Sequence, residues 1–319
     1  IINNFIFWVD IIPNGKMLNN ALFARPFNDK NAIPQQLTGD NFYIKSNFHG
    51  YGGKSYQCID INDQIYLVWI DQISKALWLQ ILKAQEVVPE NDNGYFLCDT
   101  EPKQLTEVIE SNFDTSFIIS RNKFLYGLCE INNRDYLFSL DLTKTKQKIR
   151  IIKKFDNFAG NLSSNPQGDL FSWIEWNSDY MPWEKNFLFF ASVDNDGDIQ
   201  EIREFSSKVI NDGKNVSFFQ PYWISNNLLV CSEDSTGWWN LCFLDVTDLT
   251  NIVLKKRIIQ SLTEYGSPQW VSGISFFSGT VKNLFCLAKE ENCWILQKYE
   301  NLLCVQELEL PFSSISDFG

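Results

Sequence analysis

The single histidine limits the chemistry that this chain could perform. A Ser-His-Asp triad needs a histidine to shuttle the proton, so His49 would have to serve. His49 instead sits in a Gly-rich turn before an apolar run. The nearest string to a G-x-S-x-G nucleophile elbow is GISFF at 273–277, which lacks the second glycine. We therefore predict no catalytic residue, and we expect His49 to be structural or a substrate contact at a rim.

Clustered carboxylates are the second candidate for chemistry. Glu175, Asp179 and Glu184 surround a Trp-rich stretch, and Glu233 and Asp234 lie in a later one. Two carboxylates at a suitable separation could hydrolyse a glycosidic bond. The same side chains could instead cap turns, or bind the α-amino group of a peptide. The sequence favours turn capping, and we retain Glu184 as a candidate substrate contact.

Metal and cofactor sites are not expected. The eight cysteines form no C-x-x-C pair, and one histidine is too few for a typical zinc site. The segment DNDGD at 194–198 lacks the terminal glutamate of a calcium-binding EF-hand loop, so a hairpin turn is predicted there. Neither a P-loop nor a G-x-G-x-x-G motif is present.

Composition favours a β protein that binds neither nucleic acid nor membrane. Of the 319 residues, 45% are hydrophobic and 15% aromatic, enough for a large core rich in strand-forming residues. A net charge of −12 argues against a nucleic-acid surface. The scattered cysteines suggest a reducing compartment, and no apolar run approaches the length of a membrane span. A cytoplasmic location is therefore expected.

One predicted hairpin organises the interpretation of the strands. Its two apolar runs are Asn227–Ser232 and Trp238–Val246, and the polar connection Glu233–Gly237 ends in glycine. Alternate residues of the second run are apolar on both faces. We therefore expect other elements to cover this sheet on both sides.

Similar strand groups recur along the chain. Pro166, Pro221 and Pro268 each precede a strand pair of similar character, and they lie 55 and 47 residues apart. A period of roughly 40–50 residues is typical of four-stranded propeller blades. We predict an all-β propeller with about six blades. The alternative, a set of β-sandwiches, should show cleaner one-sided alternation.

The tryptophans are predicted to pack between blades, because their rings bury large areas. The ones concerned are Trp173, Trp176, Trp183, Trp238 and Trp239. Trp183 and Trp238 adjoin turns, so these two are also candidate substrate contacts at a rim.

Four stretches resemble the propeller domain of the prolyl oligopeptidase family of serine peptidases, most closely its bacterial dipeptidyl-aminopeptidase/acylaminoacyl-peptidase branch. They occur in the family's order and are FHGYGG at 48–53, WIEW with MPW at 173–183, QPYW with DSTGWWNL at 220–241, and GSPQW at 266–270. Gly50 stands where the family usually has glutamate, and Ser235 where it usually has arginine.

The resemblance implies a partner and a role. In this family a propeller caps an α/β-hydrolase domain that carries the Ser-Asp-His triad and follows it in the chain. Residues 1–319 would then be a partial, incomplete propeller without its catalytic domain. It would gate short peptide substrates for that domain. A stand-alone propeller that acts as a binding or scaffold module and a carbohydrate-active propeller remain as alternatives.

Overall fold

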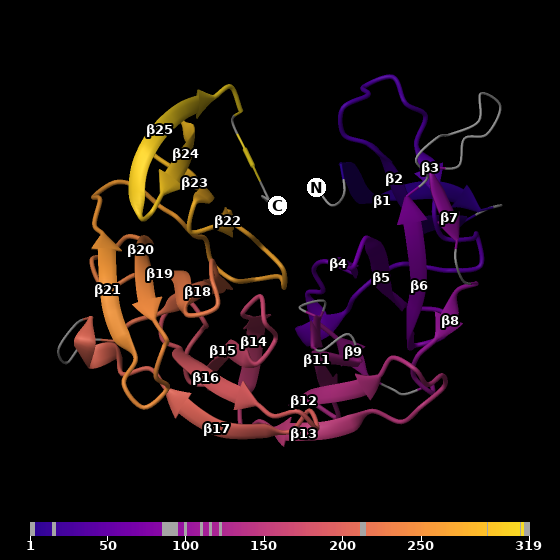
Figure 1. Cartoon of the computed structure of the whole chain (residues 1–319), viewed down its shortest axis with the longest axis horizontal. Coiled ribbons are helices and arrows are strands. Elements are labelled where there is room, and N and C mark those ends of the chain that lie inside the picture. Colours follow the sequence, from indigo (N-terminus) through magenta and orange to yellow (C-terminus); the bar gives the residue numbers. More distant parts are fainter. Residues whose placement is uncertain are drawn as a thin grey trace. The chain divides into compact units, whose positions relative to one another are not determined.

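The computed structural model describes residues 4–14, 17–84, 95–98, 101–108, 111–114, 117–120, 123–210, 215–291, 293–312 and 314–315. Their strands form six antiparallel sheets that follow one another along the chain (Figure 1). The chain divides into two compact units, Ile1–Asn132 with Phe138–Ile151 and Asn133–Leu137 with Ile152–Gly319. The predicted all-β propeller fold class is confirmed. That the ring is incomplete stays a prediction.

The first two sheets belong to the first unit. The first sheet has three strands, β1 (Phe5–Asn14), β2 (Met17–Pro26) and β3 (Gln35–Gln36). The second contains β4 (Tyr56–Ile61), β5 (Gln64–Asp71), β6 (Ala76–Ala84), β7 (Phe96–Cys98) and β8 (Lys103–Gln104). A shared core that includes Leu22, Leu67 and Trp69 joins the two sheets.

The third sheet contains the boundary between the units. Its strands are β9 (Asn112–Phe113), β10 (Ile118–Ser120), β11 (Phe124–Ile131), β12 (Arg134–Asp141) and β13 (Arg150–Lys154). Both β9 and β10 pair with β11, just as β7 and β8 both pair with β6. The five-stranded sheets therefore keep the predicted four-strand pattern with one strand interrupted.

The second unit holds three sheets of four strands each, in chain order. The first of them contains β14 (Phe158–Ser164), β15 (Leu170–Trp176), β16 (Phe187–Val193) and β17 (Ile199–Glu204). The second contains β18 (Phe218–Trp223), β19 (Leu228–Glu233), β20 (Asn240–Asp245) and β21 (Val253–Ile258). The third contains β22 (Phe277–Thr280), β23 (Asn283–Lys289), β24 (Trp294–Glu300) and β25 (Leu303–Leu310).

The predicted hairpin is the centre of this unit. Its strands are β19 and β20, so the first begins and ends one residue later than predicted and the second is shorter at both ends. One core, which includes Leu229 and Cys242, covers one face of its sheet against β14–β17. A second core, which includes Phe219 and Phe243, covers the other against β22–β25. The expected double coverage is confirmed.

This order of strands fixes where the loops lie. In an antiparallel sheet of four strands, the connection between the second and third strands lies at the end where the chain enters and leaves the sheet. We call this the link end. In the second unit it carries the β15–β16 and β19–β20 connections and the segments that join one sheet to the next.

Candidate functional site

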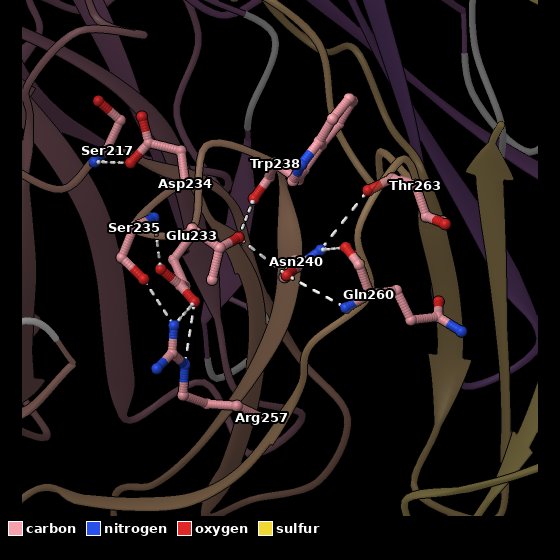
Figure 2. Close-up of polar contacts among 10 residues, drawn as sticks. Ser217, Glu233, Asp234, Ser235, Trp238, Asn240, Arg257, Gln260 and Thr263 are labelled. Atoms are coloured by element: carbon pink, nitrogen blue, oxygen red, sulfur yellow. Dashed lines mark hydrogen bonds and ion pairs between the residues drawn. The ribbon is translucent and has the colours of Figure 1, made fainter. Parts of the chain in front are cut away.

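A buried ion pair anchors the loop between β19 and β20. Glu233 ends β19 and is fully buried, and Arg257 on β21 donates to its Oε1 from both Nε, at 3.0 Å, and Nη2. Arg257 Nη2 also donates to Ser235 Oγ at 2.6 Å, and the backbone N–H of Ser235 donates to Glu233 Oε2 at 2.8 Å (Figure 2). The position where the family usually has arginine thus carries a serine that contacts an arginine from β21.

Asn240 holds the other side of the same loop. Its Nδ2 donates to the carbonyl of Gln260 at 3.0 Å and faces that of Thr263 at 3.5 Å. Its Oδ1 accepts from the Thr236 hydroxyl at 3.1 Å (Figure 2). The segment from Glu233 to Asn240 is therefore fixed by its own side chains and by the chain that follows β21.

Asp234 follows Glu233 and faces a different neighbour. Its Oδ1 accepts the backbone N–H of Ser217 at 2.7 Å, and its own N–H donates to the Ser217 carbonyl at 3.3 Å. Burial raises the pKa of the Asp234 carboxyl to about 6; the charges of Glu233 and Glu264 add to this effect, and the N–H of Ser217 opposes it. Asp234 therefore loses its proton at a higher pH than an exposed aspartate does.

Trp183 and Trp270 meet at the link end of the second unit. Trp183 lies between β15 and β16, Trp270 lies between β21 and β22, and their ring centroids are 4.5 Å apart. Trp183 also packs against the core between the last two sheets. Trp270 is 48% exposed, and Met181, two residues before Trp183, is also exposed. The result is an aromatic pair with one half-buried and one exposed partner.

Two amide side chains tie this pair to the start of β18. Asn186 donates to the carbonyls of Phe218 at 2.8 Å and Pro182 at 2.7 Å, and its Oδ1 accepts the Phe218 N–H at 2.8 Å. Gln269 donates to the same Phe218 carbonyl at 3.0 Å. The tryptophan pair and the Asp234 loop are therefore attached to adjacent residues, Phe218 at the start of β18 and Ser217 just before it.

The predicted site residues have separate surroundings. Trp238 is half-buried at the end of its loop, and its carbonyl faces the Thr236 hydroxyl at 3.3 Å. Glu184 is exposed, and its Oε2 accepts the Met181 N–H at 2.8 Å, as expected for turn capping. His49 belongs to the first unit. It is half-buried in a 3-10 turn with φ 49°, and its ring stacks on Phe48 with centroids 3.8 Å apart.

Glu175 is bonded to side chains of its own unit, as expected for a carboxylate at the end of a strand. Its Oε1 accepts from the indole of the fully buried Trp173 at 2.7 Å and lies 3.1 Å from Lys153 Nζ. The DNDGD segment is a hairpin turn, as predicted: Asp194 Oδ1 accepts the N–H groups of Asp196 and Asp198 at 2.9 Å each. These hydrogen bonds lower the pKa of Asp194.

Sequence reasoning missed three functional candidates in the second unit: Ser217, Arg257 and Asn186. None of them lies in the most distinctive part of a motif, and each acquires its role through a partner at least 17 residues away in the chain. The GSPQW stretch contains Trp270, but no spacing in the sequence indicates that Trp270 contacts Trp183. Among the residues that the structure describes, no group of His, Cys, Asp and Glu side chains could hold a metal ion.

No protein-family model and no curated protein matches the chain in sequence. Solved structures do match. A puromycin-hydrolysing peptidase from Mycobacterium tuberculosis is 18% identical with a TM-score of 0.73, over 98% of this chain and 46% of that one. A puromycin hydrolase is 16% identical with a TM-score of 0.75, over 99% and 47%.

Apo prolyl oligopeptidase B from Galerina marginata is 9% identical with a TM-score of 0.60, over 98% of this chain and 43% of that one. The chain therefore spans less than half the length of each of these proteins. At this level of identity the likeness shows the fold. The chain thus has the β-propeller fold that the motifs predicted, and it shares that fold with peptidases of the prolyl oligopeptidase kind.

Proposed function

We propose that this chain is the non-catalytic propeller of a cytoplasmic serine peptidase, and that it selects short peptides for an α/β-hydrolase domain beyond residue 319. The observation that carries the proposal is the structural match to peptidases over 98–99% of this chain but only 46–47% of theirs. The four motifs at 48–53, 173–183, 220–241 and 266–270 support it independently.

The distribution of chemistry in the chain is consistent with this role. The sequence has no G-x-S-x-G string and only one histidine, so the acyl transfer would occur on residues elsewhere. Seven described cysteines are free thiols, which supports a reducing location. Among the described residues, no helix is both long and apolar enough to cross a membrane.

Peptide contacts in the second unit are proposed at its link end. Trp183 with Trp270 offers an exposed aromatic surface there, and Trp238 and Glu184 lie on connections at the same end. Aromatic side chains provide large contact areas for peptide side chains. His49 is proposed as a contact from the first unit.

Substrate length tests the selecting role. The full-length product should be assayed with a fluorogenic dipeptide, a decapeptide and an unfolded protein chain. We expect kcat/KM to fall steeply as the substrate lengthens, because a propeller cap admits only short chains. The variant Trp270→Ala should raise KM for the short peptides, whereas Trp8→Ala, on β1 of the first unit, serves as the matched tryptophan control.

Equal cleavage of all three substrates would contradict selection by length. No change of KM in Trp270→Ala would remove the aromatic pair from the proposed contacts while leaving the selecting role intact.

A further inference from the structure

Strand β25 forms one edge of the last sheet. The strand order β22-β23-β24-β25 leaves it paired with β24 alone among the described strands, and Figure 1 shows it (yellow) at the margin of that sheet. In an antiparallel sheet, alternate residues of an edge strand direct their backbone N–H and C=O groups away from the neighbouring strand. β25 therefore presents a row of backbone groups to which another strand can be added.

The side chains of this edge are exposed, and many of them are apolar. All of residues 303–309 are exposed, with fractions of 61% for Leu303, 52% for Val305 and 54% for Leu308. The last strands of the three preceding sheets, β13, β17 and β21, each contain lysine or arginine, which discourages strand addition at an edge. β25 contains neither of these residues. It lacks the positive charges that protect the other three edges.

The regular part of the edge is Gln306–Leu310. After a register shift at Val305, these five residues pair one to one with β24. Because side chains alternate along a strand, Glu307 and Glu309 share one face, and Leu308 between them faces the other. The edge thus has a simple pattern of two carboxylates on one face and an aliphatic side chain on the other.

The charges of this pattern indicate what kind of strand would fit. Glu307 accepts a hydrogen bond from Gln297 at 2.7 Å, and neither Glu307 nor Glu309 forms an ion pair with a described residue. Residues directly opposite each other on paired strands attract when their charges differ and repel when they are alike. A second β25 added antiparallel about Leu308 would place Glu307 against Glu309. Charge therefore disfavours a second copy of this chain and favours a basic strand.

We propose that the free edge of β25 binds an extended segment of a partner protein by strand addition, and that this segment carries lysine or arginine at alternate positions with apolar residues between them. Its basic side chains would face Glu307 and Glu309, and the apolar residue between them would face Leu308. This surface is an edge strand and not a set of loops at the link end, so it is separate from the peptide contacts proposed above.

The test uses the 319-residue chain and three synthetic peptides. The first is acetyl-Lys-Val-Lys-Val-Lys-amide, the second has glutamate in place of each lysine, and the third is the lysine peptide with every backbone nitrogen methylated, which cannot donate to a strand ladder. We expect only the first to give saturable NMR shifts of the amides of Gln306–Leu310. It should also slow hydrogen exchange at alternate amides of this run, because alternate N–H groups would gain a partner.

A charge exchange separates binding from folding. The double variant Glu307→Lys with Glu309→Lys should weaken binding of the lysine peptide by about tenfold and should gain binding of the glutamate peptide. That gain also shows that the variant has kept the edge. Asp60→Lys changes an exposed carboxylate on β4, an edge strand of the second sheet, and should leave both affinities unchanged.

Four results would overturn the proposal. They are no saturable shift with the lysine peptide at about 10 mM, equal binding of the lysine and glutamate peptides, full affinity for the methylated peptide, and no gain of glutamate-peptide binding in the double variant. Dimers in sedimentation experiments, with the β25 amides already protected in the absence of peptide, would also contradict it and assign the edge to a second copy. These measurements use this chain alone, so their outcome is independent of whether a hydrolase domain accompanies it.

Discussion

At the scale of single residues, the structure shows which side chain brings an arginine to position 235. Ser235 stands where the family usually has arginine, and Arg257 on β21 brings a guanidinium group to its hydroxyl and to Glu233. The register explains why these residues meet: Arg257 pairs with Cys242 on β20, and Cys242 pairs with Cys231 on β19. Because Cys231 and Glu233 are two residues apart, Arg257 shares their face of the sheet.

Removing only the arginine of the Glu233–Arg257 ion pair should strongly lower the free energy of unfolding. Arg257→Met leaves the fully buried Glu233 without its cation, and we expect a loss of about 3–5 kcal/mol in unfolding free energy, measured by urea denaturation. The double variant Glu233→Gln with Arg257→Met should recover part of that loss. Lys255→Met breaks the exposed pair with Asp245 and should cost less than about 1 kcal/mol. Equal losses in the two single variants would contradict the assigned role.

Asp234 should make stability depend on pH in an unusual direction. Its pKa is raised from 3.8 to about 6 in the folded protein, so the folded state holds a proton that the unfolded state has released between these values. The contribution of Asp234 to the free energy of unfolding is therefore present at acidic pH, and it is lost as the pH rises through about 6.

The comparison with Asp234→Asn measures this effect. Wild type should lose unfolding free energy relative to Asp234→Asn between about pH 5 and about pH 7, in urea denaturations at each pH. Asp248→Asn should show no such relative change, because hydrogen bonds from Thr250 hold the pKa of Asp248 below 3.8. A constant difference between wild type and Asp234→Asn across this range would show that Asp234 does not titrate as described.

At the scale of elements, strand pairs were predictable because they are local in sequence. The two apolar runs and the polar stretch 233–237 between them located the β19–β20 hairpin to within two residues at each end. The bulges in the first strands were not predictable. Asn161 in β14 and Gln220 in β18 have φ of 55° and 49°, at points where the pairing register shifts. Their amides bond to Gln269 and Ser275, which both lie on the connection between β21 and β22, 108 and 55 residues further along the chain.

Two glycines with positive φ make a matched test of turn geometry. A Cβ at Gly279 in β22 would lie 2.0 Å from the Asn283 carbonyl oxygen, whereas a Cβ at Gly237 would have nothing within 4 Å. We expect Gly279→Ala to cost about 3 kcal/mol and Gly237→Ala about 1 kcal/mol, by thermal or urea unfolding. The opposite order would mean that the β22–β23 turn differs from the one described.

Asn186 should behave as a connection between neighbouring sheets. Asn186→Leu removes hydrogen bonds to the Phe218 N–H, the Phe218 carbonyl and the Pro182 carbonyl, and we expect a loss of about 1–3 kcal/mol. Hydrogen exchange at the Phe218 amide should accelerate in the same variant. Asn251→Leu, at an exposed position between β20 and β21, is the control. Unchanged exchange at Phe218 would contradict the connection.

At the scale of the whole molecule, the repeat spacing was the strongest predictor. Prolines 55 and 47 residues apart predicted repeated four-stranded units, and the second unit contains three of them. The site was less predictable. Trp183 was singled out from its position beside a turn, but its partner Trp270 lies beyond the next sheet, on the connection between β21 and β22. Such contacts depend on how sheets stack, which a pattern within one hairpin does not encode.

We propose that this propeller serves a serine hydrolase. The most direct test is to sequence the coding region on both sides of the chain and to treat the full product with a fluorophosphonate probe. We expect labelling of one serine beyond residue 319 and no labelling of the 319-residue chain itself. A full product with no downstream hydrolase and no labelled serine would contradict it.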